Sequence, residues 1–323
     1  MAEQQGFQQG CVCVLPDYGV IRASGDDARH FLHNQLTNDV DSLGNGDACL
    51  AGYCSPKGRL LATLLVWAVD DGLMLMLPKS LLPGFQKRLQ MFVLRAKVKL
   101  EDVSESLAVS GIALPAQPGM PSLLSLPDAL YRGQLLAGGV LIRVPDASGL
   151  RRALWIGPAA QRETWAATLP AGLPQGTDAD WRWLDIQAGV PQVLEATREQ
   201  FVPQMVNFEL IGGVNFRKGC YPGQEIVARS QYLGKLKRRM LLATVDVGGA
   251  DDAAAAPGTE VFADTDPGQP CGMIVNAERG PDGRIACLVE MKMDAAGAKV
   301  HLGSASGPVL AFGILPYALE AAN

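Results

Sequence analysis

The sequence predicts an α+β protein that ends in a small β-barrel. Before Arg239, apolar runs with the period of strands alternate with runs that have the period of amphipathic helices. After Met240, short strand-like runs follow one another, separated by Gly, Pro and Asp, as is typical of a small barrel. We therefore expect residues 1–239 to form one module of mixed or antiparallel sheets with helices, built as two interleaved α+β subdomains. Residues 240–323 are expected to form the barrel.

Composition points to an ordinary globular protein. Hydrophobic residues make up 48% of the 323, and the longest uncharged apolar run, residues 60–69, is much shorter than the ~18 residues of a membrane helix. The first residues lack the positive and apolar regions of an export signal. Seven cysteines, with no C-x-x-C pair, fit neither a disulfide framework nor a zinc site. We expect a cytoplasmic protein with no membrane partner and no tightly bound metal.

In the first half of the chain, the spacing of the apolar residues predicts each strand and helix. Residues 11–15 and 19–23 alternate around Pro16-Asp17-Tyr18, which predicts a hairpin. Residues 115–127, rich in proline and serine, are expected to be a surface loop. The other predicted strands are 49–54, 59–69, 73–77, 95–100, 140–144 and 153–156, and the predicted helices are 26–36, 79–93 and 159–168.

A capped helix and the barrel complete the prediction. Thr177 to Asp180 supply the cap of a helix over residues 181–188, which stops at Gly189-Val190-Pro191. Few aromatic rings follow Met240, so base stacking is poorly supported and direct nucleic-acid binding is not expected. The barrel strands are expected at residues 241–247, 258–263, 271–276, 285–290 and 309–315, with a linker at 248–257.

Two pairs of potential metal ligands are better explained as structural. Cys11 and Cys13 stand two apart, which places both sulfurs on one face of a strand. Without a second pair of ligands, this pattern favours a core face over a metal site. His30 and His33 are three apart on a helix, with no carboxylate or cysteine motif beside them, and favour a surface or capping role.

A cationic strip lies between Arg217 and Arg239. It has a local charge of +6 in a chain whose total charge is −5, so the other residues sum to −11. An isolated cationic strip on an acidic protein predicts an anionic ligand or partner. Its basic residues are Arg217, Lys218, Arg229, Lys235, Lys237, Arg238 and Arg239, against the single acid Glu225.

Cys220 is the best candidate for a reactive cysteine. It lies in a turn marked by Gly219, Pro222 and Gly223, just before a helix that is expected to begin at Gln224. A helix N-terminus and neighbouring cations favour thiolate over thiol. The alternative is a small buried hydrophobic residue, which is the usual role of a free cysteine.

The segment Lys218-Gly219-Cys220-Tyr221-Pro222-Gly223-Gln224-Glu225 resembles the K-G-C-Y-x-G-Q-E signature of the YgfZ family. The resemblance continues through residues 184–191 and 201–205, Asn207 and residues 237–239, and so spans most of the chain in order. Members of this family are folate-binding proteins linked to tRNA modification and to the maintenance of iron–sulfur enzymes. The resemblance therefore implies a reduced folate, tetrahydrofolate or a derivative, as the ligand, and iron–sulfur enzymes such as a tRNA methylthiotransferase as partners.

The resemblance also implies roles for individual residues. Cys220 would be the reactive group, Lys218 would supply charge, Tyr221 and Gln224 would supply hydrogen bonds, and Glu225 would make a salt link that orders the strip. The folate would lie in a channel lined by Tyr18, Trp181 and Gln187, with its glutamate tail drawn towards Arg229 and other basic residues of the strip. Gln187 stands where the family usually has glutamate, and Tyr18 where some members have tryptophan.

The chain also resembles the aminomethyltransferase (T-protein) of the glycine cleavage system, which shares the fold. T-proteins carry a glycine-rich strand that ends in paired aspartates, whereas this chain has Ala62 and Thr63 there. Neither side chain supplies the carboxylate that an aminomethyl transfer needs. A folate-dependent one-carbon transferase is therefore the second hypothesis. A third is a protein whose cationic strip binds an acidic partner without any small ligand.

Overall fold

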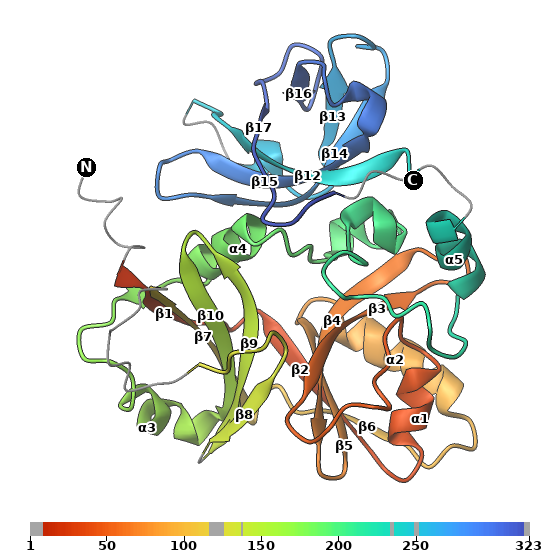
Figure 1. The fold of residues 1–323 in the computed structure, drawn as a ribbon, viewed down its shortest axis with the longest axis vertical. Helices are drawn as coiled ribbons and strands as arrows, with labels where there is room; N and C mark the ends of the chain where they lie inside the picture. Colours follow the sequence, from red (N-terminus) through yellow and green to blue (C-terminus); the bar gives the residue numbers. More distant parts are fainter. Residues whose placement is uncertain (1–8, 116–125, 137, 233–235, 249–251, 320–323) are drawn as a thin grey trace. The chain divides into compact units, whose positions relative to one another are not determined.

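A computed structural model describes residues 9–115, 126–136, 138–232, 236–248 and 252–319 (Figure 1). Most of the predicted loop at 115–127, and Lys235 of the cationic strip, lie outside these ranges. The chain divides into two compact units. The first contains residues 1–51 and 64–181, and the second contains residues 52–63 and 182–323. The predicted boundary between residues 239 and 240 falls inside the second unit and stays a prediction.

One six-stranded sheet of the first unit is mixed, as expected. The edge strand β11 is parallel to β1, and the neighbouring strands from β1 to β8 are antiparallel. Trp155 stacks on Trp165 of α3 (Arg162–Ala166), with ring centroids 4.7 Å apart, in the core beneath the sheet. The strand order is β11 (Gln175–Gly176), β1 (Cys11–Val14), β7 (Leu107–Pro115), β10 (Leu150–Pro158), β9 (Gly139–Ala147), β8 (Gly133–Leu136).

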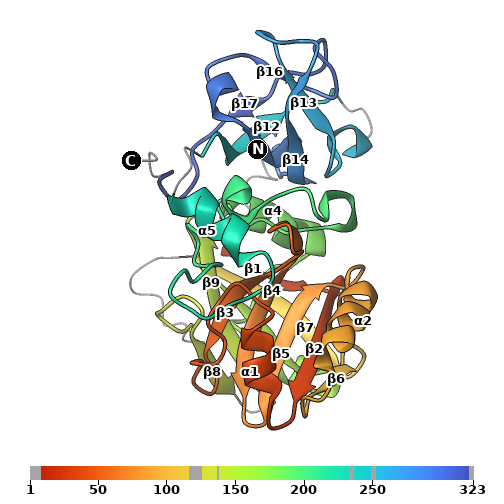
Figure 2. The same ribbon diagram turned by 90° about the vertical axis from the view of Figure 1, so that its right-hand side faces the viewer.

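A five-stranded sheet carries the helices α1 (Ala28–His33) and α2 (Leu82–Val93), which contact β5 and β2 (Figure 2). The tip of its β3–β4 hairpin, residues 52–63, belongs to the second unit. Helix α2 begins three residues later than predicted, because Pro83 lies in its first turn, where the missing N–H costs nothing. The strand order is β3 (Ala48–Cys54), β4 (Leu60–Val69), β5 (Gly72–Pro78), β2 (Tyr18–Ser24), β6 (Lys99–Asp102).

The predicted hairpin at residues 11–23 is wrong. Strand β1 pairs with β7, and β2 pairs with β5 and β6, so the two strands belong to different sheets. The Leu15 N–H donates to the Val109 carbonyl, which continues the pairing of β1 with β7 up to the point where the chain changes sheets. Alternation of apolar residues identifies a strand and its buried face, but it does not identify the partner strand.

Short helices precede the barrel. The chain passes through α4 (Asp178–Gln187), the 3₁₀ turns Glu195–Thr197 and Pro203–Val206, and α5 (Gln224–Tyr232). The predicted cap of α4 is confirmed. The Asp180 N–H donates to the Thr177 hydroxyl at 3.1 Å, and the Thr177 N–H donates to the Asp180 carboxylate at 2.7 Å.

The C-terminal strands form a barrel-like sheet. The Leu310 N–H donates to the Val300 carbonyl, and residues 311–312 pair with β12, so the last segment connects the two ends of the sheet. Strand β16 was not predicted, because three residues are too short for a period. The order is β16 (Val300–Leu302), β13 (Glu260–Ala263), β14 (Pro270–Arg279), β15 (Ile285–Lys292), β12 (Arg238–Val245), β17 (Ala311–Phe312).

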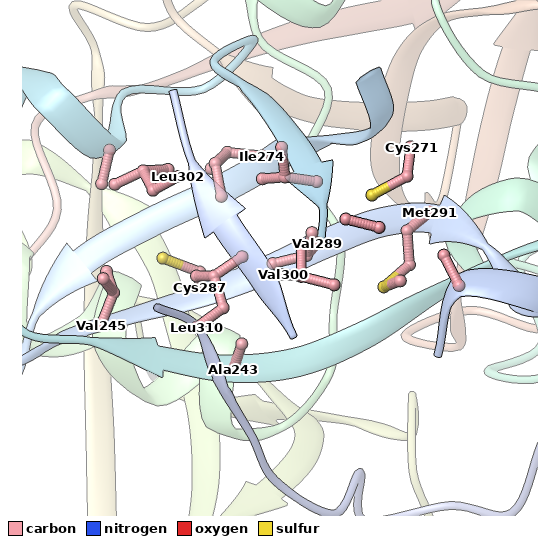
Figure 3. Packing of buried hydrophobic residues seen from close by; sticks show 14 of the residues in the cluster. Ala243, Val245, Cys271, Ile274, Cys287, Val289, Met291, Val300, Leu302 and Leu310 are labelled. Atoms are coloured by element: carbon pink, nitrogen blue, oxygen red, sulfur yellow. The ribbon is translucent and has the colours of Figure 1, made fainter. Parts of the chain in front are cut away.

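Aliphatic side chains fill the interior of this sheet. Figure 3 shows Cys271 and Cys287 among residues such as Val289, Met291 and Leu310. Burial raises the pKa of the Cys287 thiol to about 12. These two cysteines therefore serve as small core residues. Among the helices of the described ranges, none is long and apolar enough to cross a membrane.

Candidate functional site

The loop before α5 is fixed on the tip of the β3–β4 hairpin. Gly223 has a positive φ of 79°, and a Cβ there would lie 2.5 Å from the Ser55 carbonyl oxygen and 2.6 Å from the Gly58 Cα. Gly58 also has a positive φ, and a Cβ there would lie 2.9 Å from the Ile226 Cβ. Both glycines are therefore required by backbone conformation and by close approach. The backbone at the start of α5 therefore packs directly against the turn at residues 55–58.

Cys220 lies exposed in this loop, next to one buried residue. Its neighbour Tyr221 is buried, and burial raises the pKa of the phenol, with a smaller contribution from nearby Cys54. The Lys218 ammonium lies 5.2 Å from the centroid of the Tyr221 ring, within the range of a cation–π contact. The loop thus buries the ring next to Cys220, holds a cation over that ring, and leaves the thiol in solvent.

The first turn of α5 contributes the remaining predicted residues of the motif. The Gln224 amide donates to the Gly219 carbonyl at 3.5 Å, a long bond that spans the loop containing Cys220. Glu225 pairs with Arg229 one turn later at 3.5 Å, and both side chains are exposed. Such a pair contributes only a few tenths of a kcal/mol, about 0.3–0.5. Cys220, Lys218, Tyr221, Gln224, Glu225 and Arg229 thus belong to one continuous loop and helix.

Fewer basic residues of the cationic strip are exposed than its sequence contains. Arg239 is buried, pairs with Glu209, and donates to the Gln204 carbonyl at 3.0 Å. Arg238 pairs with both carboxylate oxygens of the buried Glu290. Both arginines are therefore engaged in structural ion pairs, with Arg239 buried and Arg238 half-buried, and they contribute little to an exposed cationic strip. In the described part of the strip, Arg217, Arg229 and Lys237 are exposed and Lys218 is half-buried.

Other motif residues hold the second unit together. Asn207 adopts a left-handed conformation, with φ 56°, and its buried amide donates to the Met240 carbonyl at 2.7 Å. The Gln204 amide donates to the Val227 carbonyl of α5 at 2.8 Å. These bonds connect the turn at residues 203–206 both to the first barrel strand and to the helix that follows Cys220. The resemblance at residues 201–207 thus reflects packing of the segment that carries the candidate site.

Gln187 lies at the end of α4. Its side chain is half-buried, and no hydrogen bond joins its carboxamide to any residue of the described ranges. Gly189, with φ 66°, ends the helix, and the Tyr317 hydroxyl donates to the Gly189 carbonyl at 2.8 Å. The end of the helix is therefore fixed, while the amide of Gln187 keeps its donors and acceptor for another group.

Trp181 and Tyr18 belong to the first unit. The Trp181 indole is 1% exposed, lies against the Cα of Gly111, and has the Arg152 guanidinium 4.7 Å from its centroid. Gly111 leaves room for the ring, since a Cβ there would lie 2.3 Å from it. Tyr18, the first residue of β2, is half-buried. The role of both rings in folate binding stays a prediction, and the position of Trp181 is that of a core residue.

The chemistry of these residues fits a folate in one respect. A pterin edge presents both donors and acceptors, and a half-buried carboxamide such as that of Gln187 offers one acceptor oxygen and two donors.

At the positions where T-proteins have paired aspartates, Ala62 is buried, and the Thr63 hydroxyl accepts a hydrogen bond from the Val193 N–H at 3.1 Å. Both positions in β4 are thus used for packing.

Sequence reasoning missed the turn at residues 55–58 as part of the site. Its signal was present, because Ser-Pro-Lys-Gly is a tight turn whose glycine needs a positive φ. What the sequence does not contain is the contact between Gly58 and Gly223, which are far apart in the chain. Ser55 is another addition, since its hydroxyl is buried and has no hydrogen-bond partner among the described residues.

Curated proteins named tRNA-modifying protein YgfZ match this chain. The protein from Enterobacter sp. (strain 638) is 28% identical over 310 residues, covering 95% of this chain and 93% of its own length. The protein from Serratia proteamaculans (strain 568) is 26% identical over 307 residues, covering 94% and 92%. The resemblance indicated by the motif is therefore confirmed over nearly the whole chain. No family model matches the sequence.

The fold is that of the T-protein. The crystal structure of the glycine cleavage system aminomethyltransferase T from Bartonella henselae superposes with a TM-score of 0.73. It is 15% identical in sequence, and the match covers 97% of this chain and 88% of that protein. The predicted T-protein-like fold, with mixed and antiparallel sheets and a final barrel-like sheet, is confirmed.

Proposed function

We propose that this chain, which is similar to the YgfZ proteins over nearly its whole length, is a folate-binding accessory protein. It supports the assembly or repair of iron–sulfur enzymes, including those that methylthiolate tRNA, and Cys220 is its reactive group. One observation carries this proposal. The loop that matches the family signature packs Gly223 against the β3–β4 turn, holds Lys218 near the Tyr221 ring, and leaves the Cys220 thiol exposed.

The loop's own residues favour a reactive sulfur. Arg217 and Lys218 place two cations within three residues of Cys220, and α5 begins four residues after it. Neighbouring cations and a helix N-terminus are features that reactive cysteines commonly share. A thiolate at this position is either a nucleophile or a ligand for a soft metal ion, and both suit a protein that handles iron–sulfur cargo. Here iron–sulfur cargo is the substrate and not a resident group.

Tetrahydrofolate, when bound, would carry one-carbon groups. The residues of this chain would bind it and orient it. Gln187 is the residue best placed to hydrogen-bond the pterin, because its amide is half-buried and unused by the described residues. Arg217, Arg229 and Lys237 supply exposed positive charge for the glutamate tail.

The folate assignment is tested with variants of Gln187. Gln187→Ala removes about one or two hydrogen bonds to a bound pterin and is expected to weaken tetrahydrofolate binding roughly 3- to 20-fold in calorimetry. Gln187→Glu restores the charged acceptor that is usual in the family and is expected to bind at least as tightly. Gln134→Ala, an exposed amide in the first unit, serves as the control. Equal affinity in all four proteins contradicts the assignment.

The role of Cys220 is tested by complementation. We expect Cys220→Ser to keep the fold and tetrahydrofolate affinity, because the exposed thiol makes no packing contact that serine lacks. The variant should fail to restore tRNA methylthiolation in a deletion strain. Cys49→Ser, which removes a half-buried thiol elsewhere, should restore it. Full complementation by Cys220→Ser would remove the reactive cysteine from the proposal and leave folate binding to be judged separately.

The alternative is a folate-dependent aminomethyl or one-carbon transferase, which the T-protein fold favours. The packing of Ala62 and Thr63 argues against it, because no carboxylate stands at these positions to stabilise charge on the reacting amine. We expect no methylene-tetrahydrofolate above background when aminomethylated lipoyl protein is offered as substrate. A clear product signal would make this alternative the leading function.

A further inference from the structure

Two buried thiols face each other in the first unit. The Sγ atoms of Cys11 and Cys13 lie 3.7 Å apart on one face of β1, and the residues are 4% and 0% exposed. The proposed function uses neither of them. Among the residues that the structure describes, no third ligand completes a metal site with them. What the arrangement offers is a close dithiol.

The two sulfurs are chemically unequal. The hydrogen bond shared with Cys13, together with the charge of Arg152, lowers the pKa of Cys11 against the opposing effects of burial and Asp180. The same hydrogen bond and burial raise the pKa of Cys13, with smaller contributions from the negative charges of Cys11, Asp180 and Asp178. The pKa of Cys11 is thus shifted down and that of Cys13 up, so Cys11 is the more readily ionised thiol of the pair.

The backbone of β1 allows the two sulfurs to approach. Residues two apart in an extended strand have Cα atoms about 6.6 Å apart, at the upper end of the roughly 4.4–6.8 Å that disulfides span. The sulfurs must close from 3.7 Å by about 1.7 Å. Strand β11 pairs only with Val12 and Cys13, so Cys11, the first residue of β1, has no strand on its outer side among the described pairings. A small change in backbone conformation at this end of the strand would shorten the Cα separation.

Small residues stand next to the pair on the neighbouring strands. In β7, Cys13 pairs with Gly111 and Cys11 with Ala113. On the other side, Gly176 approaches so closely that a Cβ there would lie 2.7 Å from the Cys13 sulfur. The backbone of Gly176 therefore borders the pair on one side, and the Trp181 indole covers Gly111 next to Cys13.

We propose that Cys11 and Cys13 form a reversible disulfide when the protein meets a peroxide. The Cys11 thiolate attacks one peroxide oxygen, the O–O bond breaks, and a sulfenic acid and hydroxide are formed. The hydroxide takes up the proton that Cys11 lost on ionisation and becomes water. The Cys13 sulfur then attacks the Cys11 sulfur, hydroxide leaves and takes up the Cys13 proton, and a second water is formed. Two thiols and one hydrogen peroxide thus give one disulfide and two waters.

The disulfide is expected to be labile. A bridge within one strand lies at the limit of favourable geometry, and strained disulfides are reduced more easily than structural ones. It thus differs from a stabilising crosslink, since it closes a loop of only three residues and removes little chain entropy. Its chemical result is two thiols protected from irreversible oxidation next to α4, whose Asp180 and Trp181 contact the same region.

Mass spectrometry of the intact chain after peroxide treatment tests the proposal. Both cysteines fall in the tryptic peptide of residues 1–22, which has no other cysteine. Hydrogen peroxide, followed by iodoacetamide under denaturing conditions, should give this peptide without alkylation and lighter by about 2 Da, the mass of two hydrogen atoms. Treatment with dithiothreitol before alkylation should restore two alkylated thiols. Cys220→Ser is used as the starting protein, so that the exposed thiol does not exchange.

An internal control is provided by Cys49 and Cys54. They share the tryptic peptide of residues 30–57 but lie an odd number of residues apart in β3, on opposite faces, and should both remain alkylatable. Cys13→Ser should abolish the 2 Da loss, while Cys54→Ser should keep it. Two intact thiols in peptide 1–22, a gain of oxygen without disulfide, or a bridge to another cysteine would each overturn the proposal.

Discussion

At the scale of single residues, the environment of each cysteine decides its chemistry. All seven cysteines lie in the described ranges, and among them Cys220 is exposed, Cys49 is half-buried and the other five are buried. Burial raises the pKa of the Cys54 and Cys287 thiols to about 12, which leaves them protonated at neutral pH. Exposure and neighbouring cations thus distinguish Cys220 from the rest.

This difference predicts the order of alkylation. Iodoacetamide at neutral pH should label Cys220 first, then Cys49, with the five buried thiols labelled only on unfolding. Lys218→Ala should slow labelling of Cys220 by removing a nearby positive charge, and should leave the rate at Cys49 unchanged. Peptide mass spectrometry at timed intervals measures each site in one experiment. Equal rates at Cys220 and Cys49 would contradict the prediction.

Glu209 makes a second prediction at this scale. Burial raises the pKa of this carboxyl despite its pairing with Arg239. The folded protein therefore retains a proton at pH values where the unfolded chain has lost it. The stabilisation is complete below the unfolded pKa of about 4.3 and is lost as pH rises through the higher folded value. Urea unfolding of the wild type and of Glu209→Gln should show that glutamine flattens this fall, while an unchanged pH slope would contradict it.

At the scale of elements, two loops from distant parts of the chain fix each other. Gly58 in the β3–β4 turn and Gly223 before α5 are in backbone contact, and this contact determines where the loop containing Cys220 lies. The bonds from Gln204 to Val227 and from Asn207 to Met240 then tie α5 and β12 to the same turn. The candidate site therefore depends on backbone packing more than on side-chain networks.

Gly223→Ala measures this contact. Alanine at this position would have to adopt a left-handed conformation, and its Cβ would clash with the Ser55 carbonyl and with Gly58. We therefore expect the free energy of unfolding to fall by about 3 kcal/mol. Gly283→Ala is the matched control, because Gly283 has nearly the same φ of 78° but nothing within 4 Å of the added Cβ. It should cost about 1 kcal/mol. Similar losses in urea unfolding would mean that the contact contributes little.

At the scale of the whole molecule, a few exposed cations on an acidic chain are expected to attract the negatively charged glutamate tail of a folate. The net charge is −5, yet Arg217, Arg229 and Lys237 are exposed close together in sequence. A polyglutamate form of tetrahydrofolate should bind more tightly than the monoglutamate. The advantage should shrink as salt rises, because exposed charges are screened beyond roughly 8 Å at physiological ionic strength.

Calorimetry at two salt concentrations checks this expectation. The double variant Arg217→Ala, Lys237→Ala should lose the polyglutamate advantage and keep the monoglutamate affinity. Lys87→Ala, an exposed lysine in the first unit, should change neither. Equal affinities of the two folate forms at low salt would assign the exposed cations to a different partner.

By itself the sequence determined most of the elements and the resemblance to the YgfZ proteins. Period-two and period-3.6 patterns depend on local burial, so they located most strands of both units and the helices α1, α2, α4 and α5. The signature around Cys220 indicated the resemblance that the comparisons confirm. The cap of α4 by Thr177 and Asp180 was also local and was predicted correctly.

The tertiary structure alone decided the partners of these elements. Alternation does not identify which strands pair, so the run at residues 11–23 was predicted as a hairpin although its strands enter two sheets. A charge count from the sequence does not show where each side chain points. Arg238 and Arg239 were therefore counted in a surface strip, although they neutralise the buried Glu290 and Glu209. Contacts between residues far apart in the chain, such as Gly58 with Gly223, arise from the packing of distant segments, and local sequence patterns carry no record of that packing.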